Sequence, residues 1–154
     1  MKSKLGESIN DVNANFHADR IGIVVNELKT TKAKGFTSLI TVEVKTASAT
    51  RKVAGTLLNG LGPRILRVDD FIVDVVPEGH LLFIRHKDQP GAIGRVGTLL
   101  AGEGVNIAAM QVGRSEVGGD AIMMLSIDKH VEETGIEQLK QLEDMVYFYR
   151  RMDY

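Results

Sequence analysis

Hydrophobic and polar residues alternate most clearly between residues 39 and 45, where three aliphatic side chains share one face and three polar ones share the other. A period of two residues is the pattern of a half-buried β-strand. Residues 51–58 are predicted to pair with this strand as a hairpin, and residues 64–68 and 71–76 are two further short β segments. Weak helical spacing over residues 7–20 precedes them. The first half is therefore predicted to be a small, mostly antiparallel β unit with a short helix in front.

The pattern changes after the Pro-Glu-Gly turn at residues 77–79, and we place a domain boundary there, between residues 1–78 and 79–154. Short apolar runs then alternate with two stretches of helical spacing, in the order β-α-β-β-α-β. The predicted elements cover residues 80–85, 90–103, 105–112, 120–128, 132–143 and 145–152. This order is typical of a ferredoxin-like fold. The predicted fold class is therefore α+β, with a complete ferredoxin-like domain preceded by a partial β-rich domain.

Composition and charge are those of an ordinary globular protein and exclude several classes of function. The formal net charge of −1 provides no electrostatic attraction to nucleic acid or to an acidic membrane surface. Aromatic residues make up 5% of the chain, too few for a base-stacking platform, and no apolar run approaches the roughly 20 residues that span a bilayer. Cysteine is absent and the start lacks the apolar core of a signal peptide, so we expect a cytoplasmic protein.

The richest candidate site surrounds the predicted start of the first helix of the second half. Asp88 precedes Pro90, which is favoured in a first helical turn, so Asp88 or Gln89 is expected close to the N-cap. Gly91 and Gly94 would let backbone N–H groups at the positive helix end approach a carboxylate, while Asp88 could bind an ammonium group. Asn106 begins the next strand and is expected at the same end of the sheet, where its amide can donate and accept. This combination suits a zwitterionic amino acid, although helix capping and close packing by glycine are alternative explanations.

Other active-site patterns are missing from the sequence. The glycine spacing is G-x-x-G-x-x-G, which is not the dinucleotide-binding fingerprint, and there is no phosphate-binding P-loop. No two of the four histidines stand three or four residues apart, so we predict no metal site. Neither a serine–histidine–aspartate pattern nor a cysteine nucleophile is apparent, so we predict no catalytic residue.

Six short motifs follow one another along the chain from residue 53 to residue 121. They are VAGT at residues 53–56, GPRI at 62–65, VDV at 73–75, PEGHLL at 77–82, GVNIAAMQVGR at 104–114 and GGDA at 118–121. Together they resemble the C-terminal regulatory region of long-form D-3-phosphoglycerate dehydrogenase, which is an intervening domain followed by an ACT domain. The resemblance implies that L-serine, the end product of the pathway, binds between paired ACT domains and inhibits the enzyme at a distance. It also implies a homo-oligomer formed through the ACT domains.

The resemblance further assigns ligand-binding roles to particular residues. Asp88 matches the polar residue that holds the amino group of serine, and Asn106 matches an asparagine that reaches the ligand across the interface. His86 matches a position that varies within the family. The backbone of Ile93 and Gly94 matches the segment that faces the carboxylate.

Basic residues of the first half form a second candidate site. In the family the intervening domain can present an anion site, and the candidates here are Lys45, Arg51, Arg64 and Arg67. Nothing in the sequence shows the four side chains converging, so solvated surface charges are the simpler interpretation.

The matched motifs lie outside the nucleotide-binding and substrate-binding domains of the family, so we expect no catalysis and no cofactor in this chain. Those catalytic domains, with their NAD, would belong to the parent enzyme and would be partners of this region. Two alternatives stay open. One is the ACT-containing part of another amino-acid enzyme, such as L-serine dehydratase, and the other is an oligomerisation module without a ligand.

Overall fold

The described residues of the first part of the chain form one short helix. The computed structural model describes residues 9–10, 12–29, 38–142 and 146–153, which fall into two compact units, Met1–Lys34 and Gly35–Tyr154. Helix α2 (Ala14–Arg20) belongs to the first unit. The side-chain oxygen of Asn10 accepts hydrogen bonds from the N–H groups of Val12 and Asn13, at 3.0 and 3.1 Å, and forms the turn before this helix. The predicted short helix is confirmed over part of the expected range.

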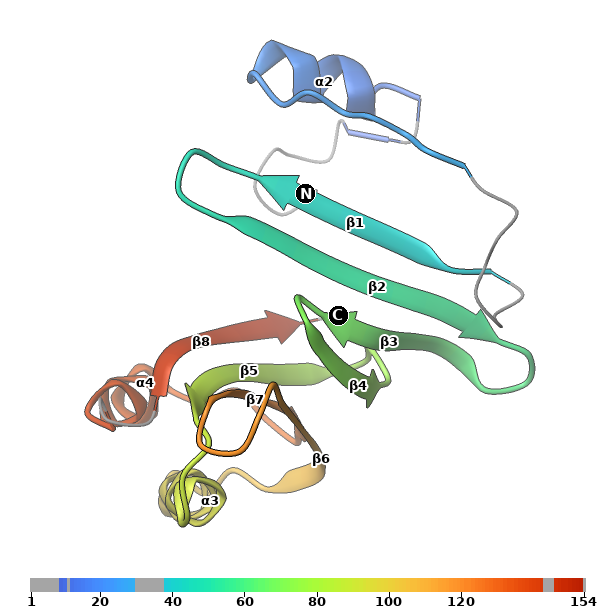
Figure 1. Ribbon diagram of the computed structural model, residues 1–154. Coiled ribbons are helices and arrows are strands. Elements are labelled where there is room, and N and C mark those ends of the chain that lie inside the picture. Colours follow the sequence, from blue (N-terminus) through green and yellow to red (C-terminus); the bar gives the residue numbers. More distant parts are fainter. Residues whose placement is uncertain (1–8, 11, 30–37, 143–145, 154) are drawn as a thin grey trace. The chain divides into compact units, whose positions relative to one another are not determined.

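The second unit begins with a four-stranded meander, in which neighbouring strands run antiparallel in the order β1-β2-β3-β4 (Figure 1). The strands are β1 (Ile40–Lys45), β2 (Thr50–Leu58), β3 (Gly62–Val68) and β4 (Phe71–Val75). The predicted hairpin is confirmed, and its register pairs Val42 with Val53. Strand β1 is exposed along its whole length, so its alternation indicates a strand without indicating a buried face.

The turn between β3 and β4 depends on Asp69. Its backbone φ of 50° is a left-handed conformation that aspartate tolerates better than most residues. The N–H of Asp69 donates to the carbonyl oxygen of Lys52 at 2.6 Å, and its carboxylate accepts the N–H of Lys52 at 3.0 Å. Asp69 therefore holds this turn against the neighbouring strand β2.

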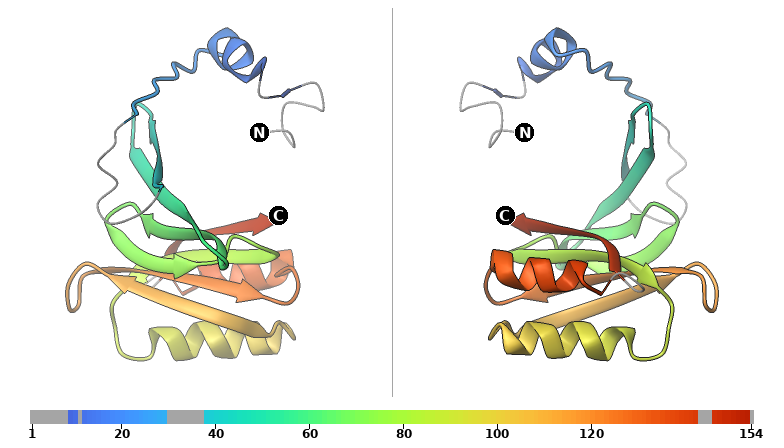
Figure 2. Two further views of the ribbon diagram at one scale, coloured as in Figure 1. Left: turned by 90° about the vertical axis from the view of Figure 1, so that its right-hand side faces the viewer. Right: turned by 90° about the vertical axis from the view of Figure 1, so that its left-hand side faces the viewer.

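The rest of the second unit is a four-stranded antiparallel sheet with two helices. Its elements are β5 (His80–Lys87), α3 (Ala92–Gly102), β6 (Ile107–Arg114), β7 (Asp120–Ile127), α4 (Glu133–Lys140) and β8 (Val146–Asp153). The strand order is β6-β7-β5-β8, and α3 lies along one face of the sheet (Figure 2). This is the predicted ferredoxin-like order, and the α+β fold class is confirmed. None of the helices in the described part of the chain is long and apolar enough to cross a membrane.

The central strands β5 and β7 are buried on both faces. Towards the helices, the core includes Leu82, Ile84, Val96, Leu100, Met123, Leu125 and Leu139. On the other face, strand β4 packs on the sheet, and the core there consists of Phe71, Val73, Val75, Leu81, Phe83, Ile122 and Met124. Coverage on both faces explains why residues 81–84 of β5 are an unbroken apolar run and not an alternating one.

Strand β4 approaches β6 closely because β6 has a glycine at the contact. A Cβ on Gly113 would lie 3.1 Å from the carbonyl oxygen of Ile72 and 3.2 Å from the Cβ of Phe71. The two sheets therefore share one unit and one core. The predicted domain boundary at residues 78–79 falls in the loop between β4 and β5, and it stays a prediction.

Replacing Phe71 by alanine should lower the free energy of unfolding by about 3–5 kcal/mol, because Phe71 is 5% exposed in the core between the sheets. The measurement is urea denaturation followed by far-UV circular dichroism. Ile72→Ala is the matched control on the same strand, since Ile72 is 73% exposed and its loss should change stability by less than about 0.5 kcal/mol. Equal effects of the two substitutions would contradict the packing of β4 on β5 and β7.

Candidate functional site

Asp88 lies in the loop from β5 to α3 and is enclosed by the hairpin between β6 and β7. Its N–H donates to the carbonyl oxygen of Gly119 at 2.9 Å. Its carboxylate Oδ2 accepts hydrogen bonds from Nη1 of Arg114 and from the N–H of Gly118, both at 3.3 Å. The Asp88 side chain is 24% exposed. Since a carboxylate can accept about four hydrogen bonds, this group is fixed in place and can still bind a cation.

The helix that follows begins with a left-handed glycine. The N-cap of α3 is Gly91, with φ of 88° and without a side-chain capping bond, so the expected position of Asp88 close to the N-cap is wrong. Asp88 instead bonds to the hairpin. A Cβ on Gly94 would meet no atom within 4 Å, so close packing within this chain does not require glycine there. The N–H of Ala92 donates to the carbonyl oxygen of Gln89 at 3.2 Å, whereas Ile93 and Gly94 are exposed residues whose N–H groups are the candidates for binding an anion.

His86 is buried under the helices. It is 2% exposed and follows Leu82 and Ile84 on the helix-facing side of β5. Its Nδ1 lies 2.7 Å from the carbonyl oxygen of Lys87, and since a carbonyl oxygen can only accept, Nδ1 donates this hydrogen bond. Among the residues that the structure describes, Nε2 has no hydrogen-bond partner. His86 therefore lies close in sequence to the loop that holds Asp88, and one of its ring nitrogens is buried without a hydrogen bond among the described residues.

Asn106 lies at the opposite end of the sheet from Asp88, which corrects the expectation that both are at one end. Strand β6 starts opposite Ile127, and Ile127 pairs with His80 at the start of β5. Asp88 follows the other end of β5, seven residue steps away, which is about 23 Å at about 3.3 Å per step. The backbone of Asn106 bonds to the carboxylate of Asp128 at 2.9 Å, and its side chain is exposed. One chain does not bring Asp88 and Asn106 together.

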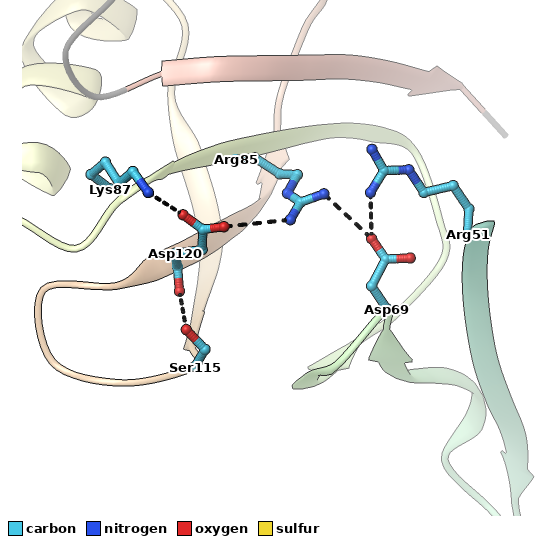
Figure 3. A network of polar contacts seen from close by, with 6 residues as sticks. All are labelled: Arg51, Asp69, Arg85, Lys87, Ser115 and Asp120. Carbon is cyan, nitrogen blue, oxygen red and sulfur yellow. Dashed lines mark hydrogen bonds and ion pairs between the residues drawn. The ribbon is translucent and has the colours of Figure 1, made fainter. Parts of the chain in front are cut away.

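A polar network joins the end of β5 and the start of β7 to the turn between β3 and β4 (Figure 3). Arg85 lies between Asp69 and Asp120, with nitrogen–oxygen distances of 3.7 and 3.9 Å, and its side chain is 17% exposed. Lys87 contacts Asp120 at 2.6 Å, and Arg51 contacts Asp69 at 2.9 Å. Sequence periodicity did not predict this network, because its carboxylates come from the turn between β3 and β4 and from the start of β7, which are far apart along the chain. The available signal was the polar end of β5, where Arg85 and Lys87 follow an apolar run.

Comparison with known proteins matches two consecutive parts of the chain to two family models. Residues 80–144 match the model of the ACT domain, and residues 1–69 match that of the D-3-phosphoglycerate dehydrogenase intervening domain. The chain belongs to the regulatory region of the D-3-phosphoglycerate dehydrogenase family. The resemblance inferred from the motifs is therefore confirmed.

Similar proteins from bacteria and archaea are named D-3-phosphoglycerate dehydrogenase. D-3-phosphoglycerate dehydrogenase of Bacillus subtilis (strain 168) is 40% identical over 146 residues, which are 95% of this chain and 28% of that protein. The Synechocystis enzyme is 40% identical over 128 residues (83% and 23%), and the Methanocaldococcus jannaschii enzyme is 39% identical over 137 residues (89% and 26%). The chain thus spans about a quarter of the length of these curated relatives.

Three of the four basic residues predicted to form an anion site each lie beside a carboxylate. Lys45 lies 3.1 Å from Glu43, Arg51 lies 2.9 Å from Asp69, and Arg64 lies 3.2 Å from Asp74. Lys45 pairs in register with Thr50, so Arg51 points to the opposite face of the sheet. Arg67 pairs in register with Ala54 on β2. The structure does not bring the four side chains together, and the anion site stays a prediction.

Glu43 should titrate at a pKa below its ordinary value, because its carboxylate bonds to the ammonium groups of Lys52 and Lys45. The measurement is a carbon-13 NMR titration of the side-chain carboxyl. Lys52→Met should raise the pKa of Glu43 more than Lys45→Met, since the bond to Lys52 is the larger cause. Lys129→Met, in the loop after β7, is a control that should leave it unchanged. An ordinary pKa in the unmodified chain would show that Lys45 is not committed to Glu43.

Proposed function

We propose that this regulatory region binds L-serine between the ACT domains of two copies and transmits the binding to an attached dehydrogenase as feedback inhibition. The observation that carries the proposal is the composition of one loop. Asp88 supplies a fixed, partly exposed carboxylate for an ammonium group, and three residues later the N-terminal turn of α3 begins, whose N–H groups suit a carboxylate. An α-amino acid carries both charges on one carbon atom.

The separation of Asp88 from Asn106 supports a site shared by two chains. Strand β6 is at the edge of its sheet, where a second β6 can pair with it. Two-fold antiparallel pairing places the start of one β6, with Asn106, beside the end of the other β6, with Arg114. Arg114 contacts Asp88 in its own chain. The pairing therefore brings Asn106 of a second copy to the Asp88 loop, and each dimer has two equivalent sites.

A route to the rest of the enzyme starts at the same hairpin. Asp120 follows Gly119, whose carbonyl accepts the N–H of Asp88, and it contacts Arg85 in the network to Asp69. A ligand that moves this hairpin would therefore act on the turn between β3 and β4. Such coupling is typically about 1–3 kcal/mol and is reciprocal. In this proposal the dehydrogenase activity, its NAD and its substrate belong to the rest of the parent protein.

Asp88→Ala should weaken L-serine binding at least about ten-fold, because it removes the charged partner of the ammonium group, while the chain remains a dimer. Isothermal titration calorimetry measures the binding and sedimentation velocity the mass. Asp74→Ala, which removes an exposed carboxylate on β4, is the matched control and should bind normally. Unchanged binding in Asp88→Ala contradicts the proposed site. Dimers without any L-serine binding would favour a ligand-free oligomerisation module.

Asp88→Ala and Asn106→Ala should each bind L-serine weakly, and mixing the two variants should restore binding if two chains share the site. A dimer of one Asp88→Ala chain and one Asn106→Ala chain has one site that lacks both groups and one intact site. Random mixing yields about half mixed dimers, so saturation should approach about 0.25 L-serine per chain. The mixture is measured by the same calorimetry after the chains have been exchanged. A site contained within one chain predicts no recovery in the mixture, and that result would refute the two-chain arrangement.

A further inference from the structure

Arg114 is the cationic neighbour of the Asp88 carboxylate. It is the last residue of β6, its side chain is 57% exposed, and its Nη1 lies 3.3 Å from Oδ2 of Asp88. The hairpin does not depend on this contact to reach Asp88. The Gly119 carbonyl binds the Asp88 N–H at 2.9 Å, and the Gly118 N–H also donates to the Asp88 carboxylate. A second role for the guanidinium is therefore open.

Backbone geometry fixes the hairpin without help from Arg114. Gly118 has φ of 75°, and a Cβ on Gly119 would lie 2.7 Å from Cγ of Glu116. The Ser115 hydroxyl donates to the carbonyl oxygen of Asp120 at 3.1 Å, and the N–H of Ser115 donates to the same oxygen at 3.0 Å. The turn is thus held by its own backbone, and Arg114 extends from its rim.

We propose that Arg114 is a specificity-determining residue that binds the α-carboxylate of the amino acid, while Asp88 binds its ammonium group. A guanidinium has five N–H donors, and the contact with Asp88 uses Nη1. Its planar fork can therefore hold a carboxylate from the side while it remains next to Asp88. The charges of Arg114, the ligand carboxylate, the ligand ammonium and Asp88 then alternate around the site. The ligand carboxylate lies between Arg114 and the first turn of α3.

This arrangement selects for a zwitterion and against a plain amine. An amine without a carboxylate would gain the Asp88 contact but would meet the positive charge of Arg114 beside it. An amino acid neutralises that charge with its own carboxylate. Arg114 also ends the edge strand β6, on the side where a second copy contributes Asn106 in the proposed dimer. The inference rests on the proposed function, because it concerns the same site.

The test compares L-serine with L-serinamide, which keeps the ammonium group and the side chain but has a neutral amide in place of the carboxylate. Calorimetry of the unmodified chain should show a preference for L-serine. Arg114→Gln should reduce that preference at least about ten-fold, because a charge-assisted bond to the carboxylate is lost. Arg114→Lys should retain part of it, because the charge remains without the planar fork. Sedimentation velocity on each variant checks that the dimer is intact.

Arg95→Gln is the matched control. Arg95 lies on α3 close to Gly91, where a Cβ would be 3.9 Å from its Nε, so it carries the same charge near the same helix start. It should keep the preference within about three-fold, as expected for an exposed charge. A preference that survives in Arg114→Gln, or that falls equally in Arg95→Gln, overturns the role of Arg114. Absence of L-serine binding in the unmodified chain overturns the proposed function, and this inference with it.

Discussion

The burial of β5 and β7 on both faces is the constraint on which the second unit depends. Leu81 and Phe83 face β4, whereas Leu82 and Ile84 face the helices, so apolar residues alone would tolerate a shift of β5 by one position. The polar end of the strand does not tolerate it. Such a shift would place Arg85 among the apolar residues beneath the helices and remove it from Asp69 and Asp120, at the cost of a buried, unpaired charge. The register of the sheet is therefore specified by the charged end of β5.

The same end of β5 positions the loop that holds Asp88. Lys87 and Arg85 contact Asp120 from β5, and the neighbouring Gly119 carbonyl binds the N–H of Asp88. Packing between the sheets and the geometry of the Asp88 loop thus share a few adjacent residues at one end of β5 and one end of β7. A displacement of the hairpin would be felt at both places, because interiors packed on both faces do not deform continuously. The packing between the sheets and the Asp88 loop would therefore be coupled through direct contacts, and a chain of residues through the core is not needed.

Local periodicity and turn chemistry were sufficient to predict the hairpin of β1 and β2 and the β-α-β-β-α-β order, because both depend on neighbours in sequence. The end of the sheet at which Asn106 lies was predicted wrongly. In a β-α-β unit the second strand runs parallel to the first, so both strands start at the same end of the sheet. The start of the second strand is therefore far from the loop that follows the first strand. The contacts of Asp69 with Arg85 and of Arg114 with Asp88 join residues 16 and 26 positions apart, and no periodicity reports such pairs. The motif resemblance assigned expected roles to Asp88 and Asn106, and it included Arg114 in the motif at residues 104–114 without assigning it a role.

A sensor whose donors lie at opposite ends of one sheet is incomplete in a single chain. In the proposed two-fold dimer, Asp88 and Arg114 of one chain meet Asn106 of the other, so the ligand binds only the associated form. By thermodynamic linkage, the factor by which dimerisation raises the affinity for the ligand equals the factor by which the ligand raises the dimerisation constant. An ordinary buried pocket would bind within each chain and leave the association unchanged. In the proposed dimer, the placement of Asp88 after β5 and of Asn106 before β6 would therefore couple ligand binding to dimerisation.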